Sequence, residues 1–282
     1  MKTNGSIYRS EAGERAIQSF YEDVLARWPV PHEQLHIPTA LSDTFVIASG
    51  APSAPPLLLL HGSSSNSAAW MGDVLAYSPH YRTYAVDIPG EPGKSAPARP
   101  SLKEEGYVGW LDDLLAALRV EQTAIVGISL GGWIALQYAI ARPGRVDKLA
   151  LLCPGGVTTP RPSWMLRLIV LSLFGERGMA AIKRAMFRGV PISEEVEAFM
   201  DLVQAHYHPR IEAPPVFSDQ ELAQVHMPTL LVAGEKDVAY NSRKTAARMR
   251  KLLPHFQAVL LPDAGHVLLG TPAQVVPFLA PA

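Results

Sequence analysis

A Gly-x-Ser-x-Gly pentapeptide separates a short apolar run from a segment rich in small and apolar residues. The run is residues 125–126, the pentapeptide extends from Gly127 to Gly131, and its central residue is Ser129. This order is typical of a tight strand-to-helix turn whose strained serine exposes its hydroxyl group. A side chain two residues before or after that serine would collide with the turn, so glycine is favoured at both places. The pentapeptide therefore predicts a strand, then a nucleophilic Ser129, then a helix.

Short apolar runs alternate with helical patterns along most of the chain. Two early strands are predicted at residues 34–37 and 44–48, around a turn at residues 41–43. Apolar runs that suit parallel strands buried on both faces occur at residues 57–60, 84–86, 123–126, 148–153, 229–233 and 256–261. Helices are predicted at residues 10–28, 107–118, 130–141, 242–253 and 271–279. This alternation favours an α/β fold, in which helices cover both faces of a mostly parallel sheet.

The alternation of strands and helices stops after residue 153 and resumes near residue 226. The intervening residues contain no clear strand pattern, and helical patterns occupy residues 164–174, 177–187 and 194–206, separated by Gly and Pro. We therefore expect residues 1–153 and 226–282 to form the core of the fold. Residues 154–225 are expected to form a helical cap, inserted between two strands of the sheet.

The length and charge of the chain limit its class. With 282 residues it can form one large domain with an insertion, and its net charge of -1, without a basic stripe, argues against nucleic acid as a partner. Residues 1–14 are polar and lack the apolar core of a secretory signal. The most apolar stretch, residues 164–174, is too short to span a bilayer and contains Arg167. We expect a cytoplasmic protein with no membrane partner, while its oligomeric state is not predicted.

No cofactor or metal is expected. Cys153 is the only cysteine, which excludes an internal disulfide and a cysteine-rich zinc site, and its apolar neighbours predict a packed thiol. His206 and His208 have a spacing that can bind a metal, but no third ligand is near them in the sequence and their side chains would point to different faces.

A serine hydroxyl needs a base to take its proton, and the base needs an acid to orient it. In folds with this kind of turn the acid and then the histidine follow later in the chain, each after a strand. Asp237 follows the predicted strand at residues 229–233, and His266 follows the last predicted strand. We therefore predict Asp237 as the acid and His266 as the base.

Two other carboxylates remain alternatives for the acid. Glu235 precedes Asp237 by two residues, and Asp263 precedes His266 by three. The other place for an acid, after the strand that ends at Cys153, is occupied by Pro154.

An oxyanion formed in such a reaction requires two backbone N–H donors. We expect one from Leu130, the residue after the serine, and the other from Ser63 in the loop after the strand at residues 57–60. His61 in the same loop is expected to make structural hydrogen bonds. Three tryptophans are candidates for lining a substrate pocket: Trp70, Trp133 and Trp164. For Trp133, just after the pentapeptide, buried packing is the alternative.

The chain resembles the α/β-hydrolase superfamily over nearly its whole length. The resemblance is carried by His61-Gly62, the Asp87 to Ser95 loop, the pentapeptide, the Gly234 to Asp237 loop and Gly265-His266. It implies an eight-stranded, mostly parallel sheet with a helical cap.

Two further segments look like those of carboxylesterases of the naproxen-esterase type: the long N-terminal helix and residues 215–222. One loop departs from the superfamily pattern. Asp87 to Ser95 is one residue longer than the usual Asp-x-x-Gly-x-Gly-x-Ser, so the resemblance does not predict its local contacts.

These residues predict a serine hydrolase that cleaves a small-to-medium carboxylic ester, with a small molecule as its only expected partner. The same triad can serve C–C bond hydrolysis, a lyase, a perhydrolase or an acyltransferase. An aminopeptidase would need acidic groups in the cap, for which Glu194, Glu195 and Glu197 are available. A ligand-binding protein on a hydrolase scaffold is a further alternative.

Overall fold

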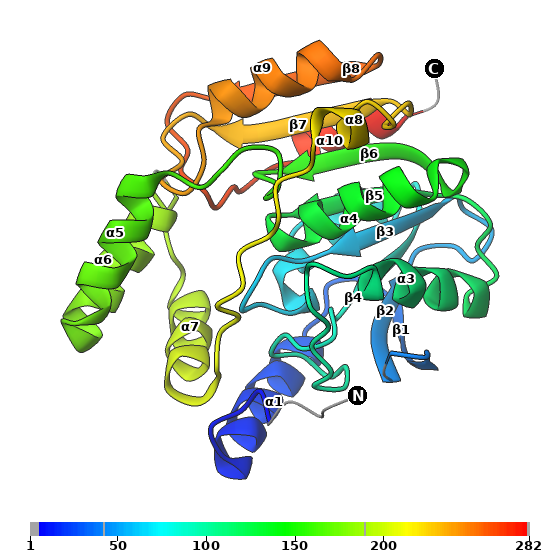
Figure 1. Cartoon of the computed structure of the whole chain (residues 1–282). Helices are drawn as coiled ribbons and strands as arrows, with labels where there is room; N and C mark the ends of the chain where they lie inside the picture. Colours follow the sequence, from blue (N-terminus) through cyan, green and yellow to red (C-terminus); the bar gives the residue numbers. More distant parts are fainter. Residues whose placement is uncertain (1–5, 42, 189, 281–282) are drawn as a thin grey trace.

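Eight strands form one sheet in the part of the chain that the structure describes (Figure 1). The structure is a computed structural model, and it describes residues 6–41, 43–188 and 190–280. The strands are β1 (His32–Pro38), β2 (Asp43–Ser49), β3 (Pro56–Leu60), β4 (Arg82–Val86), β5 (Thr123–Ile128), β6 (Val146–Leu152), β7 (Thr229–Gly234) and β8 (Phe256–Leu261). Ser42 of the predicted turn, residues 1–5 of the predicted polar N-terminus and residues 281–282 lie outside the described residues.

The order of the strands across the sheet is β1-β2-β4-β3-β5-β6-β7-β8. β2 pairs antiparallel with β1 and β4, and every other neighbouring pair is parallel. The predicted eight-stranded, mostly parallel sheet is therefore confirmed. The carboxyl ends of β3, β5, β7 and β8 meet at one edge of this parallel part, which is where the loops that carry the predicted site residues begin.

Helices cover both faces of the sheet (Figure 1). α3 (Gly106–Ala117), α4 (Leu130–Ala141) and α9 (Ser242–Leu252) share one hydrophobic cluster with the strands. α1 (Glu11–Leu25), the 3-10 helix η1 (Ser67–Trp70), α2 (Val74–Tyr77) and α10 (Pro272–Leu279) share the other. A second 3-10 helix, η2 (Pro143–Arg145), joins α4 to β6.

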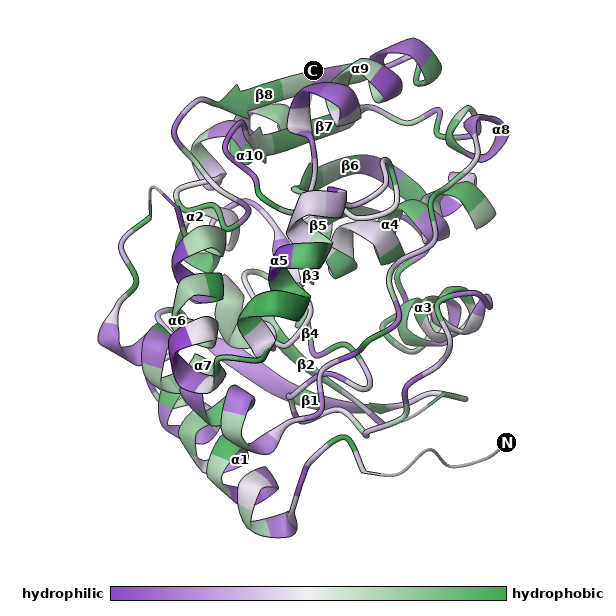
Figure 2. Ribbon diagram, turned by 60° about the vertical axis from the view of Figure 1, so that its left-hand side comes forward, coloured by the Kyte–Doolittle hydropathy of each residue, from purple (hydrophilic) through white to green (hydrophobic). Residues whose placement is uncertain are grey.

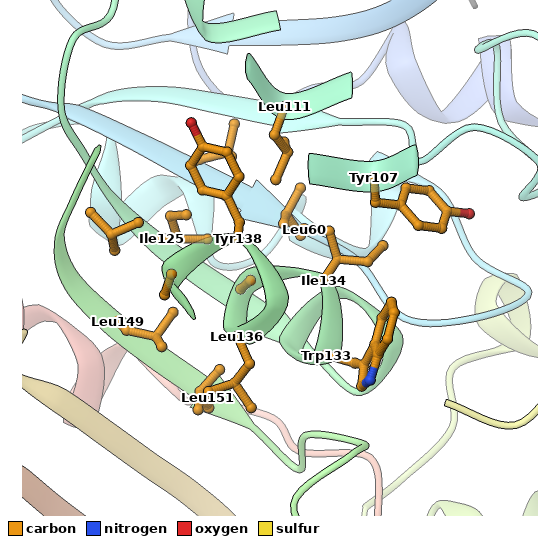
Figure 3. Close-up of a cluster of buried hydrophobic side chains, with 14 of the residues drawn as sticks. Leu60, Tyr107, Leu111, Ile125, Trp133, Ile134, Leu136, Tyr138, Leu149 and Leu151 are labelled. Atoms are coloured by element: carbon orange, nitrogen blue, oxygen red, sulfur yellow. The ribbon is translucent and has the colours of Figure 1, made fainter. Parts of the chain in front are cut away.

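The apolar runs of the central strands are explained by burial on both faces. In β3, Leu58 and Leu60 belong to the cluster under α4, whereas Leu57 and Leu59 belong to the cluster under α2 and α10. All four leucines are fully buried, and each burial contributes about 1.5–3 kcal/mol to the free energy of unfolding. Figure 3 shows α4 packing its apolar side chains against leucine and isoleucine side chains of β3, β5 and β6. This packing fixes the position of the turn between β5 and α4.

Four helices lie between β6 and β7: α5 (Pro162–Ser172), α6 (Gly175–Met186), α7 (Glu194–His206) and α8 (Asp219–Leu222). The three longer helices confirm the predicted ones, whereas α8 is too short to give a helical period in the sequence. α7 lies against α1, where Phe20 and Phe199 stack with ring centroids 5.9 Å apart. α5 and α6 pack on each other and project from one side of the sheet (Figure 1). The limits of the cap at residues 154 and 225 remain a prediction.

α5 is apolar along much of its length (Figure 2). Its exposed apolar side chains are Met165, Leu166, Ile169 and Val170, and Leu173 and Phe174 follow at its end. Within the described ranges, none of the helices combines the length and apolar character needed to cross a membrane.

Candidate active site

Ser129 lies on the tight turn between β5 and α4, as the pentapeptide predicts. Its backbone has a φ of +50° and a ψ of -104°, a region that costs a non-glycine residue about 1–3 kcal/mol. The Ser129 N–H donates to the carbonyl of Leu152 on β6 at 2.9 Å, and the Ser129 carbonyl accepts from the N–H groups of Trp133 at 3.0 Å and Gly155 at 3.2 Å. Hydrogen bonds from three directions therefore hold the strained residue in place.

Glycine is required on both sides of this turn. A Cβ atom at Gly131 would lie 2.2 Å from the carbonyl oxygen of Leu60, and one at Gly127 would lie 2.6 Å from the carbonyl oxygen of Gly131. Both neighbours are backbone atoms of the packed core and cannot move aside. The close approach brings the start of α4 against the end of β3, and with it the loop that follows β3.

The side chains of Ser129, His266 and Asp237 form a continuous chain of hydrogen bonds. His266 Nδ1 is 2.8 Å from Asp237 Oδ2, and His266 Nε2 is 3.1 Å from Ser129 Oγ. Because an ionised carboxylate only accepts, Nδ1 carries the imidazole proton, and Nε2 is free to accept the proton of the Ser129 hydroxyl. The structure thus brings together the three residues that the sequence predicts as nucleophile, base and acid, in a geometry that suits those roles.

Asp237 is held in its ionised form. Its side chain is 1% exposed, and Asp237 Oδ1 accepts the N–H groups of Ala239 at 2.7 Å and Tyr240 at 3.1 Å. Burial acts to raise the pKa of Asp237, but the hydrogen bond and charge of His266, together with the two N–H donors, outweigh it and hold that pKa below its usual value.

The two alternative acids point to other partners. Both carboxylate oxygens of Glu235 accept from Arg243 at 3.0 Å, and Asp263 pairs with Lys236 at 2.5 Å. Of the three candidate carboxylates, the structure brings Asp237 to His266.

The loop after β3 lies beside Ser129. A Cβ atom placed on Gly62 would be 3.7 Å from the Cβ of Ser129, and Ser63 follows Gly62 directly. Leu130 is the first residue of α4, so its N–H has no acceptor within the helix. His61 makes the expected structural hydrogen bonds: its Nε2 accepts from the Ile88 N–H at 2.9 Å, and its Nδ1 donates to the Gly62 carbonyl at 2.8 Å.

The three tryptophans predicted as candidates for substrate contact are buried. Trp70 lies at 0% exposure in the cluster under α2 and α10, and Trp133 stacks on Phe217 with ring centroids 5.7 Å apart. Trp164 packs against the Asp237 loop, in a small cluster that includes Ala239. Of the three, Trp164 therefore lies near a loop that carries a site residue, and contact of any of them with a substrate remains a prediction.

The sequence gives no signal for two contacts that the insertion makes with the site. The N–H of His266 donates to the carbonyl of Met186 at the end of α6 at 3.1 Å, and the N–H of Gly265 donates to the carbonyl of Arg188 at 2.8 Å. The two backbone hydrogen bonds join positions about 80 residues apart, so they leave no local pattern in the sequence. The imidazole of His266 also lies 5.9 Å from the ring of Tyr240.

Of the acidic residues at the start of α7, Glu194 and Glu197 are exposed, and Glu195 pairs with Arg27 of α1. The helix itself packs against α1. Nothing in the described part of the structure therefore favours the aminopeptidase alternative.

One group of described residues has donor atoms close enough together to suggest a metal site. It consists of Cys153, Asp237 and His266, whose donor atoms lie within 4.8 Å of one another. Asp237 and His266 already bond to each other, and burial raises the pKa of the Cys153 thiol. Because the thiolate is the form that binds metals, this donor set does not suit a metal ion.

Known proteins resemble this chain over nearly its full length. The profile of a family described as "Alpha/beta hydrolase family" matches residues 57–278. A protein of Bacillus subtilis (strain 168) named "Uncharacterized carboxylesterase nap" is 33% identical over 267 residues, which cover 92% of this chain and 88% of the relative. Carboxylesterase YbfK of the same strain is 30% identical over 273 residues, covering 92% and 89%.

The likeness extends to a solved structure. The crystal structure of naproxen esterase (carboxylesterase NP) from Bacillus subtilis matches with a TM-score of 0.85 at 29% sequence identity, and the match covers 96% of this chain and 100% of that one. Fold and sequence therefore point to the same group of proteins.

Proposed function

Because the chain belongs to the α/β-hydrolase family, we propose that it hydrolyses small-to-medium carboxylic esters through an acyl-enzyme on Ser129. Ester hydrolysis as the reaction is supported by carboxylesterases that are 33% and 30% identical to it over nearly the whole chain. The acyl-enzyme is supported by one observation above all, the hydrogen-bonded chain from Ser129 through His266 to Asp237.

In the first half of the reaction, Ser129 Oγ attacks the carbonyl carbon of the ester while its proton passes to His266 Nε2. Asp237 stabilises the imidazolium that forms. The tetrahedral intermediate then breaks its bond to the leaving oxygen, which takes the proton from His266 and departs as an alcohol. The acid part of the substrate remains bound to Ser129 as an ester.

In the second half, His266 takes a proton from water, and the hydroxide oxygen attacks the acyl carbon. The bond to Ser129 Oγ breaks, the serine recovers its proton from His266, and the carboxylic acid is released. In both halves the negative oxygen of the intermediate accepts hydrogen bonds from the backbone N–H groups of Ser63 and Leu130. Removal of one such donor typically lowers kcat by about 10²–10³-fold.

The insertion between β6 and β7 sets which esters fit. Its helix α6 ends against the His266 loop, and Trp164 of α5 packs on the Asp237 loop, so its side chains lie next to the loops that carry two of the proposed catalytic residues.

Hydrolysis of p-nitrophenyl esters with two to eight acyl carbons tests this function. We expect turnover by the unaltered chain and loss of turnover by about 10⁴ or more in Ser129→Ala, because the variant has no nucleophile. Ser53→Ala, an exposed serine in the loop before β3, is the matched control and should keep full activity. Turnover that survives in Ser129→Ala, or no turnover of any ester by the unaltered chain, would contradict the proposal.

A further inference from the structure

The loop that follows β4 places a buried carboxylate behind the loop that carries Ser63. This is the Asp87 to Ser95 loop, and its extra residue relative to the superfamily pattern falls between Gly90 and Gly93, next to Glu91. Glu91 is 1% exposed. An ionised carboxylate in such a place is unfavourable unless it is paired and hydrogen-bonded.

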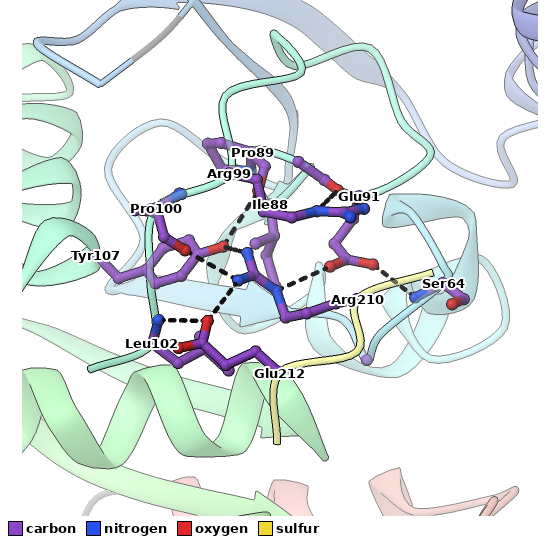
Figure 4. A network of polar contacts seen from close by, with 12 residues as sticks. Ser64, Ile88, Pro89, Glu91, Arg99, Pro100, Leu102, Tyr107, Arg210 and Glu212 are labelled. Atoms are coloured by element: carbon purple, nitrogen blue, oxygen red, sulfur yellow. Dashed lines mark hydrogen bonds and ion pairs between the residues drawn. The ribbon is translucent and has the colours of Figure 1, made fainter. Parts of the chain in front are cut away.

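One oxygen of the Glu91 carboxylate is hydrogen-bonded, and the other faces an arginine. Its Oε2 accepts the backbone N–H of Ser64 at 2.7 Å and the hydroxyl of Tyr207 at 2.9 Å. Its Oε1 lies 3.9 Å from Nε of Arg210. The guanidinium of Arg99 donates to the Tyr207 hydroxyl at 2.6 Å. Figure 4 shows Glu91 between the arginine side chains and Ser64.

Arg210 lies in the segment that follows α7 and is fixed mainly by residues before and within α3. It donates to the carbonyl of Pro100 at 2.9 Å and to the Tyr107 hydroxyl at 2.8 Å, and it pairs with Glu212 at 3.3 Å. The groups around Glu91 therefore come from three separate parts of the chain: the loop after β3, the loop before α3 and the segment after α7.

Ser64 needs such a partner because its own backbone is strained. Its φ is +57°, a value that costs a non-glycine residue about 1–3 kcal/mol. Its N–H donates to Glu91 Oε2 at 2.7 Å. Burial raises the pKa of Glu91, and the Ser64 N–H, the Tyr207 hydroxyl and the charges of Arg99 and Arg210 oppose that rise, so this hydrogen bond favours the ionised form. Glu91 thus stabilises the conformation that Ser64 would otherwise leave.

The peptide group before Ser63, which carries the Gly62 carbonyl and the Ser63 N–H, is held from the opposite side. The carbonyl of Gly62 accepts the Nδ1 proton of His61 at 2.8 Å. In a trans peptide the carbonyl and the next N–H point in opposite directions, so this bond sets the direction of the Ser63 N–H. The Ser63 residue therefore lies between two fixed points, His61 acting on the Gly62 carbonyl and Glu91 acting on the Ser64 N–H.

We propose that Glu91 is a positioning residue, which acts through the Ser64 N–H to aim the Ser63 N–H at the oxyanion. This inference rests on the proposed function, because the oxyanion forms only if Ser129 attacks a carbonyl group. It also gives the longer Asp87 to Ser95 loop a role, since that loop delivers Glu91 to Ser64.

The test compares Glu91→Ala and Glu91→Gln with a matched control, Asp112→Asn, on p-nitrophenyl butyrate. Asp112 of α3 also accepts from a tyrosine hydroxyl and an arginine, Tyr138 at 3.0 Å and Arg142 at 3.0 Å, but belongs to a different network. We expect Glu91→Ala to lower kcat by about 10–100-fold, a part of the effect of losing one oxyanion donor, with KM within about threefold. Glu91→Gln keeps an acceptor without the charge and should lose only about 3–10-fold. Asp112→Asn should stay within about twofold.

The affinity for a trifluoromethyl ketone distinguishes a misdirected Ser63 N–H from a general loss of structure. Ser129 converts this inhibitor to a charged tetrahedral adduct, whose oxygen needs the same N–H donor. The affinity should fall by the same factor as kcat in each Glu91 variant, while thermal unfolding shows that the variant is folded. If Glu91→Ala does not fold, Glu91→Gln decides the matter.

Full kcat in either Glu91 variant, or a fall in kcat without a matching loss of ketone affinity, would overturn the inference. Either result leaves the proposed function standing so long as the unaltered chain cleaves the ester and Ser129→Ala does not. Absence of turnover in the unaltered chain would instead count against the proposed function.

Discussion

Ser129, the proposed nucleophile, has a strained backbone conformation, and the tight turn that holds it restricts which residues can lie beside it. Gly127 and Gly131 lie where any Cβ atom would meet a backbone atom of the core. The pentapeptide could be predicted from the sequence because the constraint is local. Asp237 and His266 could be predicted because each follows a strand in the required order. The sequence could not decide between buried packing and pocket lining for Trp133, because the answer depends on packing between distant elements.

Alanine in place of Gly131 should destabilise the fold and remove activity. The new Cβ would lie 2.2 Å from the Leu60 carbonyl oxygen, and we expect a loss of about 3 kcal/mol in the free energy of unfolding. Gly109→Ala is the control, because a Cβ there meets nothing within 4 Å and alanine favours the α3 helix by about 0.5–1 kcal/mol. Urea unfolding of both variants measures the difference; equal effects would show that the close approach is absent.

Asp237→Asn should lower kcat by about 10⁴, the loss expected when the acid no longer fixes the imidazole tautomer. Glu235→Gln and Asp263→Asn are the controls, since each carboxylate pairs with a surface cation rather than with His266. Steady-state kinetics on one ester compares the three variants. Near-normal activity in Asp237→Asn, or a large loss in either control, would mean that another carboxylate orients His266.

Among the elements, the longer strands and helices were predictable and the shortest were not. The apolar runs of β3, β5, β6 and β7 and the helices α1, α4 and α9 follow from periodicity and burial. η1, α2 and α8 have four residues each, too few for a helical period, and their places are set by tertiary contacts. One of these contacts joins α2 to α10 and involves a partly buried carboxylate: the Thr271 hydroxyl donates to Asp73 at 3.1 Å.

The Asp73 carboxylate should make stability depend on pH. Burial raises its pKa to about 6, although the Thr271 hydroxyl opposes this. Because the pKa is higher in the folded chain than in the unfolded one, the protonated form favours folding. Its contribution is therefore full below about pH 4 and is lost as the pH rises through 6. Asp73→Asn stays neutral, so it should be more stable than the unaltered chain at pH 7.5, by at most about 3 kcal/mol.

Urea unfolding of both chains at pH 4.5 and pH 7.5 measures this difference. The difference in free energy of unfolding between Asp73→Asn and the unaltered chain should be smaller at pH 4.5 than at pH 7.5. A difference that grows as the pH falls would contradict a raised pKa for Asp73.

At the scale of the whole molecule, the sheet provides the reacting groups and the insertion contacts two of the loops that hold them. The insertion could be located in the sequence because strand patterns stop after residue 153. Its packing could not be predicted: α7 lies on α1, and α5 with α6 rests on the loops of Asp237 and His266. Such contacts depend on shape rather than on periodicity. The sequence therefore predicts the start of the reaction better than it predicts the range of substrates.

The central claim is that Ser129 is a nucleophile activated by His266 and Asp237. Reaction with a fluorophosphonate tests this claim most directly. Mass spectrometry of the intact chain should show one added phosphonyl group, and peptide mapping should place it on Ser129. Labelling should disappear in Ser129→Ala and become much slower in His266→Ala. A chain that is not labelled, or that carries the label on another serine, would contradict the account.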